Sequence, residues 1–344
     1  MQFVDNINPN PLASRNAKDI QLTGITASAV SITVKRAGTA VCTFAAEPYS
    51  GSLRIRLRDI LNSVLPFEFQ VPPQDYGDTE VGTVSLEASA TGQAAPTPWS
   101  RTAFRSGYDS SFHSALMNSY WWTWRDQRCR TFPLGKEYIG ALFSSGTTQV
   151  KVLATFSDGT TSQENLCSVV VAADKKKFAV IDVSFGVIAE LFPGKTIRSY
   201  KIQRGGSAYA QVYEVSRLPF RKAFIFRNSL GLFDTVYATG RISDGASRDV
   251  KTFISEDRSE NIADNNSRER IYVNSGHVDT RGERTLWDEM VFSPDVWEWT
   301  GGKFRKIIID RFDYKLQQGI SDSLSFEYHY SEAPSGRGFE KSEI

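Results

Sequence analysis

The sequence predicts an all-β protein with little helix, and three observations support this fold class. Apolar and polar residues alternate with a period of two along much of the chain, which is the pattern of half-buried strands. The alternating segments are rich in β-branched and aromatic residues, and aromatics make up 12% of the chain. Glycine-containing turn pairs separate the segments, as in antiparallel hairpins. We therefore expect antiparallel sheets that pack as sandwiches.

Individual strands are recognised by their alternation and by the turns between them. Four turn pairs each predict a hairpin: Ala37-Gly38, Asp158-Gly159, Gly205-Gly206 and Gly301-Gly302. The final segment, 324–330, places Leu, Phe and Tyr on one face and polar residues on the other. The only helix that we expect covers 57–65, because Pro66 cannot continue it.

A further tight turn is expected at Asn228-Ser229-Leu230-Gly231, between two strands. Asn and Ser side chains hydrogen-bond turn backbone, and glycine adopts a positive φ at little cost. The sequence therefore predicts a positive φ at Gly231.

The length of 344 residues and the distribution of breakers predict three domains. We place boundaries near 108 and 216, which gives an N-terminal β-sandwich (1–108), a central β-sandwich (109–215) and a C-terminal β-rich domain (216–344). Each is expected to be Ig-like. Segment 255–270 contains a single large aliphatic residue among many charges and amides, so we interpret it as an exposed loop or arm that becomes ordered against a neighbouring protein.

The charge balance excludes several classes of partner. Lys plus Arg is 40 against Asp plus Glu 39, and no block carries a strong net charge, so we expect no nucleic-acid binding. The start lacks the features of a secretory signal, and the most apolar stretch is too short and too polar to insert in a membrane. The three cysteines are too few for a disulfide framework, which favours a reducing place of synthesis.

Signatures of catalysis are incomplete. The Gly194-Lys195-Thr196 stretch lacks the first glycine of a phosphate-binding loop, and the three histidines are far apart in sequence. Carboxylates beside tryptophans, namely Asp288, Glu289 and Glu298, are the best candidates for a glycosidase pair. We interpret them as a surface face, and expect no catalytic residue, cofactor or metal, and no enzymatic activity.

Aromatic and arginine clusters carry more information about contacts. Tyr120 to Trp124 is predicted to be a strand with Trp121 on one face and Trp122 and Trp124 on the other, and Trp297 and Trp299 share a face. Core packing, a protein interface and glycan stacking all remain open for these residues. Arg54, Arg56 and Arg58 are predicted to line one face of a strand, as a solvated or charge-paired face or as a phosphate-binding one. The candidate interface therefore comprises Trp121, Trp124, Trp297, Trp299, Arg54, Arg56 and Arg58.

Three stretches together resemble a family. They are Pro48-Tyr49 followed by a strand running into a short helix at 53–61, the strand-turn-strand segment 224–235, and the final strand 323–330. The chain resembles the multi-sandwich proteins encoded in tail gene clusters of tailed phages and prophages. That resemblance implies a virion component of the tail or its distal end, with no catalytic residues to transfer.

The expected function is a non-enzymatic structural or attachment component of a phage tail, such as a baseplate, tail tip or fibre-like part. Its partners would be other virion and tail proteins and further copies of itself, with a host surface glycan or protein as an additional partner. It would be assembled in the host cytoplasm and then reside in the virion. The alternatives are a carbohydrate-binding or adhesion module and a glycoside-active enzyme.

Overall fold

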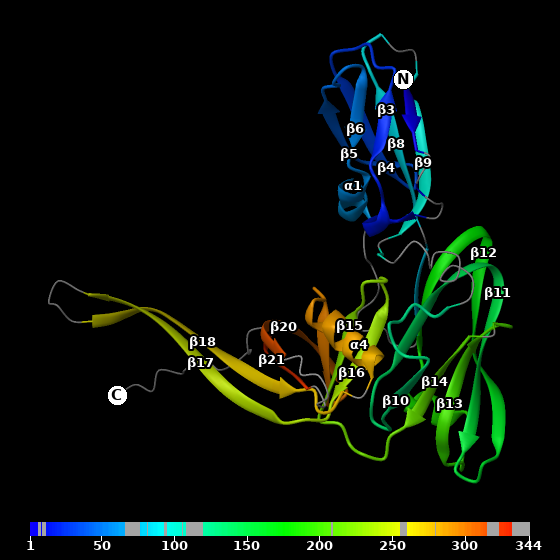
Figure 1. Ribbon diagram of the computed structural model, residues 1–344, viewed down its shortest axis with the longest axis vertical. Helices are drawn as coiled ribbons and strands as arrows, with labels where there is room; N and C mark the ends of the chain where they lie inside the picture. Colours follow the sequence, from blue (N-terminus) through cyan, green and yellow to red (C-terminus); the bar gives the residue numbers. More distant parts are fainter. Residues whose placement is uncertain are drawn as a thin grey trace.

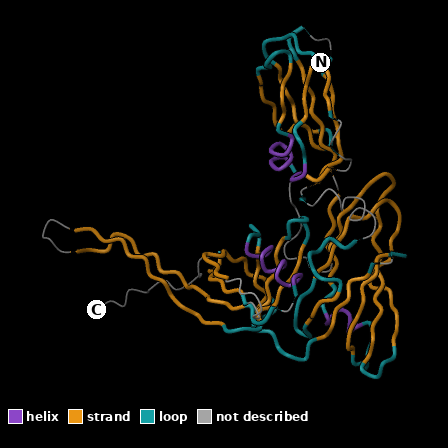
Figure 2. The backbone as a smooth tube through the Cα atoms, in the orientation of Figure 1, coloured by secondary structure: helices purple, strands orange, loops and turns teal. Residues whose placement is uncertain are grey.

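A computed structural model describes residues 1–5, 8, 12–65, 76–80, 82–92, 95–104, 106–107, 120–207, 209–254, 260–278, 280–314 and 323–331. For 76–80, 82, 104, 246–254, 260–269 and 314, only the backbone is described. Strands dominate this part of the chain and helices are few, which confirms the predicted all-β fold with sandwich-like packing (Figures 1 and 2). The described residues form four sheets, and two strands of one sheet extend from the body as a projecting arm (Figure 1).

Two sheets form the N-terminal unit, at the top of Figure 1. The smaller sheet has the order β1-β3-β6 and the larger the order β2-β9-β8-β4-β5. Their strands are β1 (Gln2–Val4), β2 (Leu12–Ala13), β3 (Ile20–Thr23), β4 (Val30–Arg36), β5 (Thr39–Ala46), β6 (Ser52–Ile55), β8 (Gly82–Ser89) and β9 (Thr97–Phe104). Alternate residues such as Val30, Ile32 and Val34 are fully buried in the core of this unit.

One face of a short helix completes the N-terminal core. The helix α1 (Leu57–Val64) follows β6 directly and buries Leu57, Leu61 and Val64, which the 3.6-residue period places on one side. A single 3-10 turn, η1 (Ser14–Asn16), packs beside it, where Ser14 donates to the side-chain oxygen of Asn62 at 2.7 Å. The predicted helix is thus confirmed.

The middle unit is a single six-stranded sheet of order β10-β14-β13-β11-β12-β7. Its strands are β7 (Tyr76–Glu80), β10 (Arg128–Thr131), β11 (Tyr138–Phe156), β12 (Thr161–Asp182), β13 (Ile197–Arg204) and β14 (Ala210–Val215), with α3 (Phe185–Glu190) between β12 and β13. All pairs are antiparallel except β10 with β14, and β2 with β9 in the N-terminal unit is likewise parallel. These two parallel pairs are exceptions in sheets that are otherwise antiparallel, as the sequence predicts.

The third unit is a seven-stranded sheet of order β16-β15-β19-β20-β21-β18-β17. Its strands are β15 (Lys222–Arg227), β16 (Phe233–Ala238), β17 (Ile242–Ile254), β18 (Glu260–Asn274), β19 (Val296–Thr300), β20 (Lys303–Tyr314) and β21 (Leu324–Tyr330). Helix α4 (Arg281–Val291) covers one face and buries Leu286, Trp287 and Met290 against Phe224 and Phe326.

The middle and third units share a hydrophobic core. In β15, Phe224 and Phe226 face α4, whereas Ile225 between them belongs to the core of the middle sheet. Phe233 and Leu232 join that same core. The middle sheet also takes strand β7 from the N-terminal block. The division into domains at 108 and 216 stays a prediction. Strand β7 crosses the first boundary by pairing with β12, and Ile225, Leu232 and Phe233 cross the second by packing in the core of the middle sheet.

The predicted turns are present. Gly231 has a φ of 99°, and its N–H donates to Asn228 O at 3.0 Å, while Asn228 N–H donates to Leu232 O at 2.8 Å. Hairpins close at Gly38, Gly159, Gly205 and Gly301-Gly302, all with positive φ. The final strand buries Leu324, Phe326 and Tyr328 as expected.

Two helices were not expected from the sequence. The shorter, α3, lies inside an apolar stretch that resembles a buried strand in composition. The longer, α4, begins at Thr280, whose side chain accepts a hydrogen bond from Glu283 N–H at 3.1 Å. None of the helices among the described residues is long and apolar enough to cross a membrane.

The segment expected to be an exposed loop is largely strand. Residues 260–270 belong to β18 and pair with β17, whereas 255–259 lie outside the described residues. Residues 271–274 of β18 pair with β21. The rest of the described part of β18 pairs with β17. The two strands leave the body as a narrow ribbon (Figure 1). The described part of this segment is thus one strand of a hairpin arm, and the pairing satisfies the backbone groups that face between β17 and β18. That the arm becomes ordered against a neighbouring protein stays a prediction.

Candidate functional site

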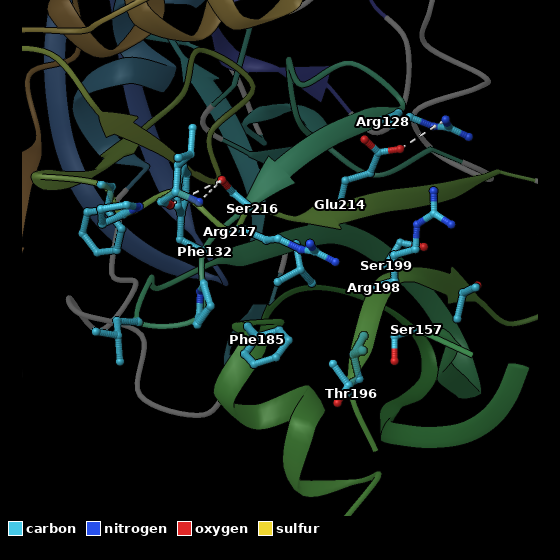
Figure 3. Close-up of a pocket in the computed structure, with 18 residues that line it drawn as sticks. Arg128, Phe132, Ser157, Phe185, Thr196, Arg198, Ser199, Glu214, Ser216 and Arg217 are labelled. Carbon is cyan, nitrogen blue, oxygen red and sulfur yellow. Dashed lines mark hydrogen bonds and ion pairs between the residues drawn. The ribbon is translucent and has the colours of Figure 1, made fainter. Parts of the chain in front are cut away.

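A large groove lies at one end of the middle sheet (Figure 3). It has a volume of about 1200 Å³ and is open to solvent. The start of β10, the ends of β11 and β14 and the start of β13 form its floor, and the loop 216–220 and Phe185 of α3 form its walls. Because it spans several strand ends, this groove can accommodate an extended chain segment.

Charged side chains of the groove are mostly basic. Arg128 forms an ion pair with Glu214, with 3.2 Å between Nη1 and Oε1, and both side chains are at least half exposed. Arg198 and Arg217 are also exposed and line the same groove. Three arginines against one glutamate leave a formal charge of +2, so the groove favours a segment that carries carboxylates.

Exposed apolar residues border the basic groove. Leu134 is 84% exposed and Leu218 is 72% exposed, each next to a proline. A soluble surface tolerates single leucines, but two beside one hollow indicate a contact surface. The groove therefore presents both an apolar and an electrostatic component to a partner.

Local hydrogen bonds and aromatic packing hold this border in place. Ser216 Oγ accepts a hydrogen bond from Leu218 N–H at 3.2 Å. The ring of Pro219 restricts the φ of that residue. Phe132 and Phe220 pack on Tyr237, with ring centroids 4.6 and 5.0 Å away. Because these side chains are fixed by the fold, a partner would not have to order the groove before it binds.

A buried ionic cluster lies beneath, where the middle and third units meet. Arg125 contacts Glu137 and Asp234, and its Nε lies 3.2 Å from Asp234 Oδ1. Arg125 Nη2 donates to Thr235 O at 3.2 Å, and all three charged side chains are at most 2% exposed. The cluster connects a loop before β10 to strands of both sheets.

Burial governs the ionisation of this cluster. Desolvation raises the pKa of Glu137 to about 7, although the Arg125 charge acts in the opposite direction. Desolvation also raises the pKa of Asp234, against the effects of Arg125, Thr123 and Asn228. Burial raises the pKa of the Cys129 thiol to about 12, so this thiol is not activated as a nucleophile. The contacts of the cluster are those of a structural junction.

A further buried carboxylate, Glu298, is also fully engaged. It forms an ion pair with Lys222, and it accepts hydrogen bonds from Tyr328 Oη at 2.5 Å and Tyr330 Oη at 2.8 Å. Burial together with Glu298 raises the pKa of Tyr330 to about 12. This arrangement ties β15, β19 and β21 together.

The other two carboxylates considered for a glycosidase pair do not join Glu298. Glu289 accepts from Ser229 N–H at 2.7 Å and from Ser229 Oγ at 2.9 Å, so it caps the 228–231 turn. Asp288 lies on α4, where burial raises its pKa. Glu298 sits inside the sheet with its own partners, and the geometry gives these three residues separate structural roles.

The Tyr120–Trp124 segment is irregular backbone instead of the predicted strand. Trp121 and Trp122 are therefore both buried, at 5% and 0% exposure, because no pleat forces them to opposite faces. Trp121 donates from Nε1 to Ile202 O at 3.3 Å. Trp121 thus packs in the core, which is one of the three roles left open for it, and its part in a protein interface stays a prediction.

The remaining candidate tryptophans contact other parts of this chain. Trp124 is half-buried and donates from Nε1 to Ser229 Oγ at 2.9 Å. Trp297 and Trp299 do share a face of β19, and that face packs toward the middle sheet: Trp297 lies on Phe233 and Trp299 on Phe304. Their role in contacts with other proteins stays a prediction.

The three arginines of the N-terminal unit are not one strand face. Arg54 lies on β6 and pairs with Asp19, with 2.6 Å between Nε and Oδ2. Arg56 precedes the helix and Arg58 lies in its first turn, because β6 ends at Ile55. All three are exposed. The predicted alternation is wrong here since a helix begins where the strand was expected to continue.

No group of three or more His, Cys, Asp or Glu that could hold a metal ion is present in the described residues. His329 pairs with Asp310, with 2.8 Å between Nδ1 and Oδ2. The sequence analysis did not identify the groove residues. A leucine next to a proline occurs at Pro133-Leu134 and at Leu218-Pro219, and these two pairs are the sequence signal that could have indicated the groove. Both leucines are exposed in the structure.

Comparisons with known proteins do not assign the chain to a family. No protein-family model matches the chain, and no curated protein matches its sequence. Among solved structures, it is similar to a chain of a "Virion of native gene transfer agent (GTA) particle", with 11% identity and a TM-score of 0.20, over 29% of this chain and 85% of that one. Likeness at this level carries no argument about fold or function.

Proposed function

We propose that this protein is a non-enzymatic structural component of a phage tail or comparable particle, and that it acts through contacts with other proteins. The observation that carries the proposal is the β17–β18 arm. Its register runs from Ile242 opposite Val273 to Ile254 opposite Glu260, well beyond the last residues paired with β21. The resemblance of three sequence stretches to phage tail proteins suggests the same class.

The energetics of the arm favour a partner. A free two-stranded ribbon is marginally stable, because it has no third strand or helix to bury a face. Ordering each residue costs about 1 to 2 kcal/mol, and a polar ribbon recovers little of this by burial. A segment of this kind is useful to a protein that reaches a neighbour and gains the missing contacts there.

The groove supplies a second contact surface on another unit of the same chain. Its exposed leucines and arginines suit a protein segment, and its border is already ordered. A chain with a projecting arm and a separate groove can bind two neighbours at once, which is what a component of a repetitive particle requires.

A role without catalysis agrees with the carboxylates. Glu137 and Asp234 share Arg125, Glu298 is held by Lys222 and two tyrosines, and Glu289 caps a turn. Each of these side chains is used to join elements of the fold. The proposal includes assembly with other tail proteins in the host cytoplasm, multiple copies in the virion, and host-surface contact as a further role.

The test compares particles released by cells with and without this gene. After density-gradient purification, immunoblotting should find the protein in the particle fraction. Negative-stain microscopy of the deletion strain should show tails that are absent, shortened or lacking their distal part. Complementation with the full chain should restore them, and complementation with a Lys18→Glu chain, changed at an exposed residue outside the candidate contact surfaces, should do so equally. Normal, infectious particles without the protein would contradict the proposal.

A further inference from the structure

We propose that the tip of the arm of one copy docks in the basic groove of the next copy, so that copies join head to tail. This inference rests on the proposed function, since it specifies how copies would meet in a particle. It follows from the charges of the two segments and from the direction of the arm.

The groove carries a surplus of positive charge. Its charged lining consists of Arg128, Arg198 and Arg217 against Glu214, which gives three minus one, or +2. Glu214 is already paired with Arg128, so its charge is partly compensated. Arg198 and Arg217 are therefore the side chains best able to attract an acidic segment.

The tip of the arm is the acidic part of that element by sequence. Segment 253–264 contains four acidic residues and one basic residue, a net charge of −3, together with one phenylalanine and two isoleucines. The neighbouring stretch 242–252 has two acidic and two basic residues, and 265–274 has one acidic and two basic. In the sequence, negative charge is thus concentrated in and next to the segment that links β17 to β18, and the same stretch includes apolar residues of the kind that border the groove.

The direction of the arm decides between its own groove and that of a neighbour. From Gly245 to Ile254 the ribbon extends about 30 Å, at a rise of about 3.3 Å per residue. It leaves the third unit on the side opposite the middle sheet (Figure 1). A tip that points away from its own groove meets the groove of another molecule, and the occupant is a second copy of this chain.

A tip-to-groove contact joins two different surfaces. Such a heterologous interface repeats from copy to copy, and it closes into a ring or continues as a helix depending on the rotation per copy. The contact should also weaken with salt, because exposed charges are screened within about 10 Å at 0.1 M ionic strength.

The experiment measures self-association of the full chain by sedimentation velocity, with charge reversals on each side. Arg198→Glu/Arg217→Glu reverses the groove, and Glu256→Lys/Asp257→Lys reverses the tip. Each double variant should weaken self-association about tenfold or more. A mixture of the two variants should recover association, since each reversed surface then meets its complement. Lys18→Glu is the matched control, a charge reversal at an exposed residue of the N-terminal unit that belongs to neither surface and should change nothing.

Several outcomes would overturn the inference. Wild-type chains that remain monomeric would do so, as would reversals that leave association unchanged or a mixture that does not recover. Association lost in Thr43→Lys, on the exposed edge strand β5, but retained in the groove variant would show that copies pair through that edge instead. Presence of the protein in particles is measured separately, so the proposed function can hold while this inference fails, or the reverse.

Discussion

Replacement of Arg125 by methionine should be the most destabilising single change in the buried junction. Methionine keeps much of the side-chain volume but removes the charge from between Glu137 and Asp234, which are 1% and 0% exposed. Removing one partner of a buried ion pair typically costs about 3 to 5 kcal/mol, because the remaining charge is left without compensation. We expect a loss of free energy of unfolding in that range.

The two carboxylates should not contribute equally to this loss. Asp234 keeps hydrogen bonds from Thr123 Oγ1 at 2.5 Å and Asn228 Nδ2 at 2.7 Å, whereas Glu137 loses the ion pair that compensates its charge. A second change, Glu137→Gln, should therefore recover at least about 1 kcal/mol in the Arg125→Met background. This non-additivity is expected for residues in one network.

Urea unfolding followed by tryptophan fluorescence gives the measurement, since Trp121 and Trp122 are buried close by in the chain. The stability of wild type, both single variants and the double variant forms a complete cycle. The penalty of Arg125→Met should also shrink at acidic pH, where the orphaned carboxylates become protonated. A single-variant loss below about 1 kcal/mol, or a double variant less stable than Arg125→Met, would refute the reasoning.

Three further predictions concern single positions. Gly231→Val should lower the free energy of unfolding by about 1 to 3 kcal/mol, because the φ of 99° strains a branched side chain; an unchanged melting temperature would contradict the turn assignment. Between pH 4.5 and 7 the folded state keeps a proton on Glu137 that the unfolded state loses. The raised pKa of Glu137 therefore adds to the free energy of unfolding in full below pH 4.5, and this addition is lost as the pH rises through about 7. Glu137→Gln should remove that slope from the urea midpoints, and a slope equal to that of wild type would count against the raised pKa. Trp121→Ala should cost about 3 to 5 kcal/mol through the cavity it leaves, and a variant as stable as wild type would show that Trp121 is not a core residue.

Local patterns were sufficient to predict the strands and most of their turns. The alternation of Val30, Ile32 and Val34 identifies the buried face of β4 because a strand exposes successive residues to opposite sides. Gly231 is identified by the turn chemistry of its neighbours, and α1 by the apolar spacing that Pro66 ends. These features depend on a few adjacent residues, so the chain carries them without reference to its tertiary structure.

A local signal for α4 was present and was not used. Thr280 and Glu283 have the spacing of a helix N-terminal capping box, and the Thr280 side chain does accept a hydrogen bond from Glu283 N–H. The helix itself is charged and has few apolar residues, so its hydrophobic pattern is weak. Capping residues would have predicted its start better than hydrophobicity did.

The sequence by itself determined the fold class, most of the strand faces and the turns. Only the tertiary structure decided what those strands pack against. It buried Trp121, turned Trp297 and Trp299 toward the middle sheet, and brought Arg125 together with Glu137 and Asp234. The groove likewise joins residues from β10, β13 and the loop 216–220, which are far apart in the chain. Such juxtapositions depend on how whole sheets pack, because a period of two shows which residues share a face but not which surface covers it.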